Sequence, residues 1–265
     1  MYVDVRGQKT FFSSGSQAHQ PGRASVLFVH GAGFDHTLWT MPARYFARQG
    51  LNVVAVDLPG HGRSQGDALT TIEAMAAWLD ELLAALDIES AAVVGHSMGS
   101  LAALAMAADY PDRVSRLVLL GTAIPMPVSD MLLDAARDKV ASAIDMANTW
   151  SHSLHGRQGG NFNPGISMMM AEQRLLERAG PGVYHADFAA CNGFTNGDDC
   201  AARVKAQTTV ILGLEDKMTR PASSRAVAAA IPGSRVVELE GCGHSMLSEE
   251  PNRVLDALIE AVLRD

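Results

Sequence analysis

The sequence contains little of what a disulfide-stabilised or nucleic-acid-binding protein needs. Its 265 residues include only three cysteines, Cys191, Cys200 and Cys242, an odd number whose spacing matches no metal-binding motif. We expect reduced thiols and a cytoplasmic protein, with a Cys191–Cys200 pair left open as an alternative. The 21 lysine and arginine residues form no basic run and are outnumbered by 29 acidic residues, which excludes nucleic acid as a partner.

Long apolar segments are also missing. No run approaches the roughly 20 residues that cross a bilayer, so we expect no membrane partner. The first six residues lack the positive start and the apolar stretch of a secretory signal. Hydrophobic residues nevertheless make up 48% of the chain, which is enough for a sizeable core. The formal charge of −8 favours a dispersed protein and leaves its oligomeric state open.

Short apolar runs rich in β-branched residues indicate strands buried on both faces. Residues 2–13 alternate between polar and apolar and predict a hairpin at a sheet edge. Strands that alternate with helices imply an α/β fold with a mostly parallel sheet flanked by helices. The predicted strands are Ser25–Val29, Asn52–Val56, Ala91–Val94, Val114–Leu120, Thr208–Leu212 and Arg235–Leu239. The predicted helices are Thr71–Leu86, Leu101–Ala108, Ser223–Ile231 and Pro251–Leu263.

The interval from Ile124 to Arg203 interrupts this alternation, because it contains no convincing buried strand. Amphipathic stretches over Asp130–Trp150 and Ile166–Ala179 surround a glycine-rich loop at 156–165. The interval is too long for a connection and too apolar for a linker. We therefore predict a core domain at 1–123 and 204–265 and a helical cap insertion at 124–203.

The sharpest motif is Gly95-His96-Ser97-Met98-Gly99, a G-x-S-x-G sequence between a predicted strand and a predicted helix. Its glycines permit a tight reversal that holds the Ser97 hydroxyl above the sheet, at a helix N-terminus that favours developing negative charge. Ser97 is therefore the predicted nucleophile. His96 is its neighbour on the strand, where adjacent side chains point to opposite faces, so we expect His96 to pack beside the site.

A serine hydroxyl needs a base, and His244 is the best candidate among nine histidines because it lies in a glycine-rich loop after the last strand. Asp216 follows the preceding strand and is the predicted acid, with Glu215 as its rival. The chain order of Ser97, Asp216 and His244 is that of serine hydrolases with this elbow. We expect the remaining histidines without such context to be surface or pocket-lining residues: His19, His36, His152, His155 and His185.

An oxyanion intermediate needs backbone donors. One is expected from the N–H of Met98, directly after the nucleophile. The other is expected from the His30–Asp35 loop, at Ala32, with Gly33 as the alternative. Asp35 is expected to cap the helix that follows.

Together these residues resemble the α/β-hydrolase superfamily, and the segment Asp57–Ser64 also matches a structural loop of that family. The resemblance covers 25–120 and 208–263 and implies a catalytic triad without cofactor or metal. Dehalogenases and many epoxide hydrolases of this fold carry an aspartate where Ser97 stands. Hydroxynitrile lyases often have a lysine where Ser245 follows His244. Ser100 replaces a common glycine but is small enough for the same contact.

For the substrate we expect a neutral, moderately apolar ester or lactone, because no arginine pair stands out as a clamp for a carboxylate. Gly33, His96, Trp150 and Met168 are the predicted substrate contacts. Other apolar residues of the cap are candidates for lining the pocket: Met126, Met131, Met146, Met169, Met170, Phe162 and Phe188.

Three functions compete. The first is a carboxylesterase that forms an acyl-enzyme at Ser97. The second is a C–C hydrolase of ring-fission products or an enol-lactonase that uses the same triad. The third is a non-catalytic small-molecule receptor, which the intact triad disfavours.

Overall fold

The computed structural model of the chain describes residues 1–138, 140–160 and 165–264. Its strands are β1 (Tyr2–Val5), β2 (Gln8–Ser13), β3 (Ser25–Val29), β4 (Asn52–Val56), β5 (Ala91–His96), β6 (Val114–Leu120), β7 (Gln207–Gly213) and β8 (Arg235–Leu239). They form one eight-stranded sheet in the order β1-β2-β4-β3-β5-β6-β7-β8. The strands from β3 to β8 are parallel, whereas β1 and β2 pair antiparallel at one edge. The predicted α/β architecture is therefore confirmed.

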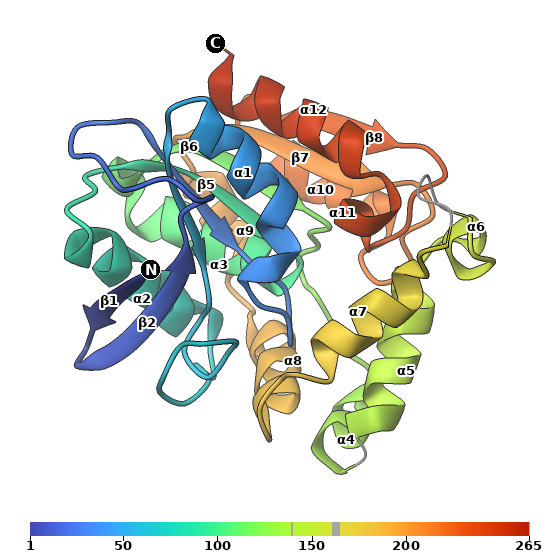
Figure 1. The fold of residues 1–265 in the computed structure, drawn as a ribbon. Helices are drawn as coiled ribbons and strands as arrows, with labels where there is room; N and C mark the ends of the chain where they lie inside the picture. Colours follow the sequence, from blue (N-terminus) through green and yellow to red (C-terminus); the bar gives the residue numbers. More distant parts are fainter. Residues whose placement is uncertain (139, 161–164, 265) are drawn as a thin grey trace.

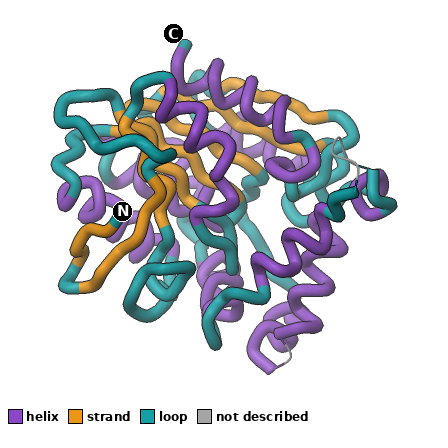
Figure 2. Tube along the Cα trace, in the orientation of Figure 1, coloured by secondary structure: helices purple, strands orange, loops and turns teal. Residues whose placement is uncertain are grey.

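Helices cover both faces of the sheet (Figures 1 and 2). Those of the body are α1 (Thr40–Arg48), α2 (Ile72–Ala85), α3 (Met98–Asp109), α10 (Pro221–Ala230), α11 (Met246–Glu249) and α12 (Pro251–Leu263). Two short 3-10 helices, η1 (His36–Trp39) and η2 (Pro111–Arg113), join them. Between β6 and β7 lie α4 (Asp130–Asp138), α5 (Val140–Ser151), α6 (Leu154–Arg157), α7 (Met168–Leu176), α8 (Val183–Gly193) and α9 (Gly197–Arg203).

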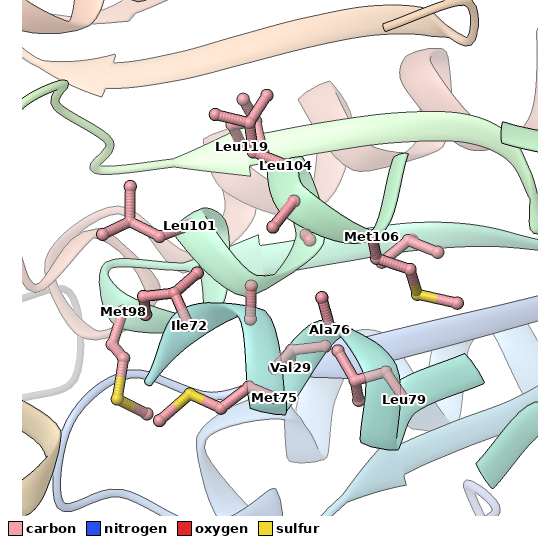
Figure 3. Packing of buried hydrophobic residues seen from close by; sticks show 14 of the residues in the cluster. Val29, Ile72, Met75, Ala76, Leu79, Met98, Leu101, Leu104, Met106 and Leu119 are labelled. Atoms are coloured by element: carbon pink, nitrogen blue, oxygen red, sulfur yellow. The ribbon is translucent and has the colours of Figure 1, made fainter. Parts of the chain in front are cut away.

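The core lies in two layers because neighbouring residues of a strand face opposite sides of the sheet. In β3, Val26 and Phe28 belong to the apolar cluster under α1 and α12, whereas Leu27 and Val29 belong to the cluster under α2 and α3. Figure 3 shows the second cluster, where side chains of α2 such as Met75 pack near those of α3. Both faces are buried, which explains why the strands are continuous apolar runs rather than alternating ones.

In its described part, the insertion between β6 and β7 contains helices joined by loops and no strand, as its lack of strand patterns predicted. The stretch Asp130–Trp150 is not one helix, because α4 and α5 are separate and pack against each other. The stretch Ile166–Ala179 shortens to α7. In Figure 1, α4, α5 and α7 lie together away from α1 and α12, whereas α9 packs on α3 of the body. The boundaries of a cap domain at 124–203 stay a prediction.

The sequence patterns did not predict five of the described helices: α1, α6, α8, α9 and α11. α9 has seven residues, which is too few for a periodic pattern, and it is held by packing on α3. Asp35 caps η1, as expected, by accepting the N–H of Thr37. The three cysteines are buried and unpaired, so no Cys191–Cys200 bridge forms. None of the helices described has both the length and the apolar character needed to cross a bilayer.

Candidate active site

Ser97 occupies the sharp turn between β5 and α3. Its φ of 53° and ψ of −121° are unusual for a residue with a side chain and mark a strained backbone. A Cβ on Gly95 would clash with the backbone of Gly99, and a Cβ on Gly99 would clash with the carbonyl of Val29. The close approach of these backbones accounts for both glycines of the motif. It also places Ser97 at the N-terminus of α3, in the lining of a cavity that is described below.

Asp216 and His244 form a buried pair. Oδ2 of Asp216 lies 2.7 Å from Nδ1 of His244 and accepts the Thr219 hydroxyl, also at 2.7 Å. Oδ1 accepts the N–H groups of Met218 and Thr219, each at 2.8 Å. Burial disfavours the carboxylate, but His244 and Thr219 outweigh it and hold the pKa of Asp216 below its ordinary value. With a hydrogen on Nδ1, the His244 imidazole keeps Nε2 free to accept a proton.

The pKa of His244 is raised above its ordinary value. Burial acts in the opposite direction, but the negative charge and hydrogen bond of Asp216 outweigh it. The imidazolium that a proton transfer from Ser97 would create is therefore stabilised by the same carboxylate that orients the ring.

The loop that carries His244 is tied to the end of α5. The N–H of His244 donates to the carbonyl of Ser151 at 2.6 Å. The Glu249 carboxylate bridges the two segments, because it accepts the N–H of Gly243 at 3.0 Å and the N–H of Ser153 at 2.9 Å. The position of the imidazole therefore depends on the insertion as well as on the body.

Two further residues hold the His244 ring. His96 donates from Nε2 to the His244 carbonyl at 3.0 Å, and the two ring centroids are 4.9 Å apart. Burial first, and then the nearby His244, lower the pKa of His96 to about 3, so it is neutral. On the other side, a Cβ on Gly121 would lie 2.9 Å from Cε1 of His244. Only a glycine leaves room for the ring there.

Ser97 and His244 line the same two cavities, although 147 residues separate them along the chain. The larger cavity has a volume of about 180 Å³, and its outer wall includes Met126, Leu132 and Phe188. The smaller cavity has a volume of about 30 Å³ and extends toward α5 and α7. The three predicted triad residues are thus brought to one place, because Ser97 and His244 line both cavities and Asp216 pairs with His244.

Ala32 also lines both cavities. The N–H of its neighbour Gly33 is already engaged, because it donates to Oδ2 of Asp187 at 2.8 Å. This favours Ala32 over Gly33 as an oxyanion donor. Met98 occupies the first turn of α3, where backbone N–H groups have no acceptor within the helix.

The acceptor of the Gly33 N–H belongs to a buried ion pair that sequence reasoning missed. Nε2 of His61 lies 2.9 Å from Oδ2 of Asp187, and Nδ1 of His61 donates to the carbonyl of Pro59 at 3.0 Å. A carbonyl and a carboxylate only accept hydrogen bonds, so both ring nitrogens carry hydrogen and His61 is a cation. Burial opposes this charge, but Asp187 raises the pKa of His61 above its ordinary value. The one sequence feature that could have indicated this pair is Asp187 itself, a single acidic residue in the otherwise mostly apolar helix α8.

Of the four predicted substrate contacts, only one lines either cavity. Trp150 lines the larger cavity. Gly33, His96 and Met168 are not among the described residues that line either cavity; Gly33 instead packs under the Tyr184 ring. Phe162 lies outside the described residues. Two of the methionines named as candidates are exposed: Met131 and Met170.

Glu215, the rival acid, is exposed and accepts the N–H of Leu154 at 3.1 Å, away from His244. The expectation that His36 and His152 are surface or pocket-lining residues is wrong. His36 is buried against Asp57, with its Nδ1 2.7 Å from a carboxylate oxygen. His152 is fully buried behind the cavity wall. Their partners come from distant segments, so the local sequence did not reveal them.

Asp35, His36 and Asp57 bring three atoms that can ligate a metal within 4.8 Å of one another. These carboxylates are already used, because Asp57 accepts backbone N–H groups at both oxygens and Asp35 caps η1. The group therefore serves the structure of the loop. A further hollow of about 410 Å³ is lined by Ser25 and Asn52, at the amino ends of β3 and β4. Ser97 lies at the carboxyl ends of the parallel strands, so this hollow is at the opposite edge of the sheet from the candidate site.

Comparison with known proteins agrees with this fold. A family model described as the alpha/beta hydrolase fold matches residues 24–251. The 2-hydroxymuconate semialdehyde hydrolase of Pseudomonas sp. (strain CF600) is 30% identical over 237 residues, which cover 83% of this chain and 80% of that protein. The pimeloyl-[acyl-carrier protein] methyl ester esterase of Aromatoleum aromaticum is 27% identical and covers 91% of this chain and 99% of its own length.

Among solved structures, the enol-lactonase from Burkholderia xenovorans LB400 superposes with a TM-score of 0.85 at 22% identity, over 98% of both chains. This likeness shows a shared fold. Since the family model spans most of the sequence, the chain belongs to the α/β-hydrolase superfamily.

Proposed function

We propose that this hydrolase cleaves an ester or lactone of a small, moderately apolar carboxylic acid, with Ser97, His244 and Asp216 as its catalytic triad. The observation that carries the proposal is the buried His244–Asp216 pair, whose imidazole shares a cavity with Ser97 at its strained turn. A base oriented by a carboxylate, beside a hydroxyl at a helix N-terminus, is the arrangement that acyl transfer to serine requires.

In the first half of the reaction, Nε2 of His244 takes the Ser97 proton while the serine oxygen attacks the substrate carbonyl. The N–H groups of Ala32 and Met98 are the proposed donors to the oxyanion of the tetrahedral intermediate. When the intermediate collapses, the imidazolium returns the proton to the departing alcohol oxygen. The acyl group is left as an ester of Ser97.

In the second half, the neutral imidazole takes a proton from water, and the resulting hydroxide attacks the acyl-enzyme carbonyl. Collapse of this second intermediate breaks the bond to Ser97, which recovers its proton from His244. The products are a carboxylic acid and an alcohol, or a hydroxy acid from a lactone. No cofactor enters any step.

The walls of the larger cavity support the choice of substrate. Its volume of about 180 Å³ suits a compact group, and Met126, Leu132, Trp150 and Phe188 form an apolar part of its lining. Lys217 and Thr219 also line it, whereas none of the described arginines lines either cavity, so no arginine clamp for a carboxylate is present among the described residues. We also propose that the enzyme works in the cytoplasm, where its unpaired cysteines stay reduced.

The test is hydrolysis of p-nitrophenyl esters of increasing acyl length together with labelling by a fluorophosphonate. We expect turnover of short esters and stoichiometric labelling at Ser97. Both should be abolished in Ser97→Ala, which keeps the melting temperature, and in His244→Ala, which stays folded. Activity retained in Ser97→Ala overturns the triad. Folded protein that is neither labelled nor active supports the receptor alternative instead.

A C–C hydrolase is the second candidate, and the 30% identity to the 2-hydroxymuconate semialdehyde hydrolase favours it. The same triad would serve, with a carbon atom rather than an alcohol oxygen as the leaving group. Ring-fission dienoates measured beside the esters separate the two. A much higher kcat/KM on a dienoate assigns the chain to carbon–carbon cleavage.

A further inference from the structure

The smaller of the two cavities has buried polar side chains in its wall. It also begins at Ser97 and His244, but its inner wall carries polar side chains from α5 and α7, among them Asn148 and Glu172. These two side chains are almost fully buried, with 3% and 7% of their surfaces exposed. Polar groups that are buried at a cavity wall need hydrogen-bond partners, and most of the polar atoms of these two side chains have one.

Asn148 has an acceptor without a partner. Its Nδ2 donates to the carbonyl of Met169 at 2.9 Å, which fixes the orientation of the amide because a carbonyl cannot donate. The remaining atom is therefore Oδ1, and it has no hydrogen-bond partner among the described residues. An unpaired acceptor in a protein interior is unfavourable unless a ligand or water supplies a donor.

Glu172 adds a second set of acceptors. Its Oε1 accepts the Ser245 hydroxyl at 2.7 Å, and its Oε2 lies 3.5 Å from Nε2 of His152. The other ring nitrogen of His152 donates to the carbonyl of Asn148 at 2.8 Å. Oxygen lone pairs of the carboxyl group remain for the cavity.

The wall is poorly suited to a charged ligand. Burial outweighs the favourable contacts with His152 and Ser245 and raises the pKa of Glu172. Because an ammonium group is far more costly to remove from water than a hydroxyl or an amide, the unpaired Asn148 oxygen in this buried wall favours a neutral donor.

We propose that this smaller cavity, lined by Asn148 and Glu172, is a subsite for a neutral hydrogen-bond donor of the substrate, a hydroxyl or an amide N–H close to the scissile bond. The inference rests on the proposed ester hydrolysis. The volume of about 30 Å³ limits the group to one or two heavy atoms. The substrate is then bifunctional, with an apolar group in the larger cavity and a compact polar group in the smaller one.

The test compares substrates that differ by one atom. On the acyl side these are the p-nitrophenyl esters of hydroxypropionate and butyrate; on the alcohol side they are the butyrates of ethylene glycol and propanol. We expect the hydroxyl to raise kcat/KM by about tenfold or more in one of the two series, because a site built for a hydroxyl rejects the methyl analogue. Equal rates in both series overturn the subsite, and so does a preference for the β-alanine ester over the hydroxypropionate ester.

The variants Asn148→Leu and Glu172→Gln test whether these two side chains cause the preference for the hydroxyl. We expect Asn148→Leu to bring the hydroxyl-to-methyl ratio of kcat/KM to near one, and Glu172→Gln, which keeps the shape, to reduce it while the melting temperature is unchanged. Met126→Leu in the larger cavity is the control and leaves the ratio as it is. A ratio that survives both variants places the donor elsewhere.

The two proposals fail in different ways. If both members of each pair are hydrolysed equally and Ser97→Ala is inactive, the subsite is wrong and the hydrolase stands. If the chain neither hydrolyses the esters nor reacts with a fluorophosphonate, the proposed function itself is wrong.

Discussion

At the scale of the residue, the acid of the proposed triad is more firmly held than its exposed neighbour. Asp216 accepts three hydrogen bonds besides the one from His244, whereas Glu215 is exposed and contacts the insertion. The two adjacent carboxylates therefore form a matched pair for mutation.

We expect Asp216→Asn to lower kcat by about 10³–10⁴-fold, because an amide cannot hold the tautomer of His244 with Nε2 free. Glu215→Gln is the control and should change kcat less than about threefold, as expected for an exposed charge. Steady-state kinetics on a short p-nitrophenyl ester give both numbers. Greater damage from Glu215→Gln would assign the acid to Glu215.

The pH profile depends on the same pair. His244 acts as a base only when it is neutral, and its pKa is raised by Asp216, so kcat/KM should be low in acid and rise to a plateau above the ordinary histidine range. In Asp216→Asn the rising limb should move to lower pH, because the charge that stabilises the imidazolium is gone. A limb that does not move would mean that another group limits the rate.

Gly121 offers a steric test of the ring position. In Gly121→Ala a Cβ would lie 2.9 Å from the His244 ring, and the φ of 56° adds backbone strain. Gly233 has a comparable φ of 69° but open space around it, so Gly233→Ala carries the strain alone. We expect only Gly121→Ala to lower kcat, by about tenfold or more, since small misplacements of a catalytic group are costly. Equal kcat values in the two variants would remove the steric argument.

At the scale of the element, α8 connects the insertion to the loop proposed to bind the oxyanion. Asp187 of α8 accepts the Gly33 N–H and pairs with the His61 cation, so one side chain holds a loop and a histidine of the body. Breaking a buried pair by neutralising one partner is costly, because the other charge is left without compensation.

We expect Asp187→Asn to lower the free energy of unfolding by about 3–5 kcal/mol at pH 6. The raised pKa of His61 means that its contribution is complete below the ordinary histidine pKa and is lost as the pH rises through the raised value. The difference between the parent protein and the variant should therefore shrink between pH 6 and pH 9. Urea unfolding at both pH values measures it, and a constant difference would argue against a cationic His61.

The helices of the insertion carry several residues of the site that the sequence did not predict. The positions of Ser97, Asp216 and His244 were predictable because each follows a predicted strand in a glycine-containing turn. His61, Asn148, Glu172 and Asp187 were not, because their roles depend on which faces of the inserted helices meet the body. A single polar residue in an amphipathic helix does not reveal that face.

At the scale of the whole molecule, we expect a core residue that does not line the cavities to affect stability rather than catalysis. Leu79 of α2 is fully buried in the larger cluster and does not line either cavity. Leu79→Ala should therefore cost about 2–5 kcal/mol of unfolding free energy through the cavity that it leaves.

The same variant should keep the kcat of the folded fraction. Met131→Ala, at an exposed position of α4, should change stability by less than about 0.5 kcal/mol. Denaturant titration and active-site labelling separate the two effects. A large loss of kcat per labelled site in Leu79→Ala would show that the core and the site are coupled.

The attachment of the His244 loop to α5 has a consequence for how substrate enters. Ser151 and Ser153 on one side and His244, Ser245 and Glu249 on the other are joined by three hydrogen bonds, so that end of the insertion cannot swing outward without displacing the imidazole. We therefore expect any movement that admits substrate to occur at the end of the insertion that is not tied to this loop. Amide protons of the tethered loop should accordingly exchange with deuterium on the slow timescale of the sheet while the enzyme turns over.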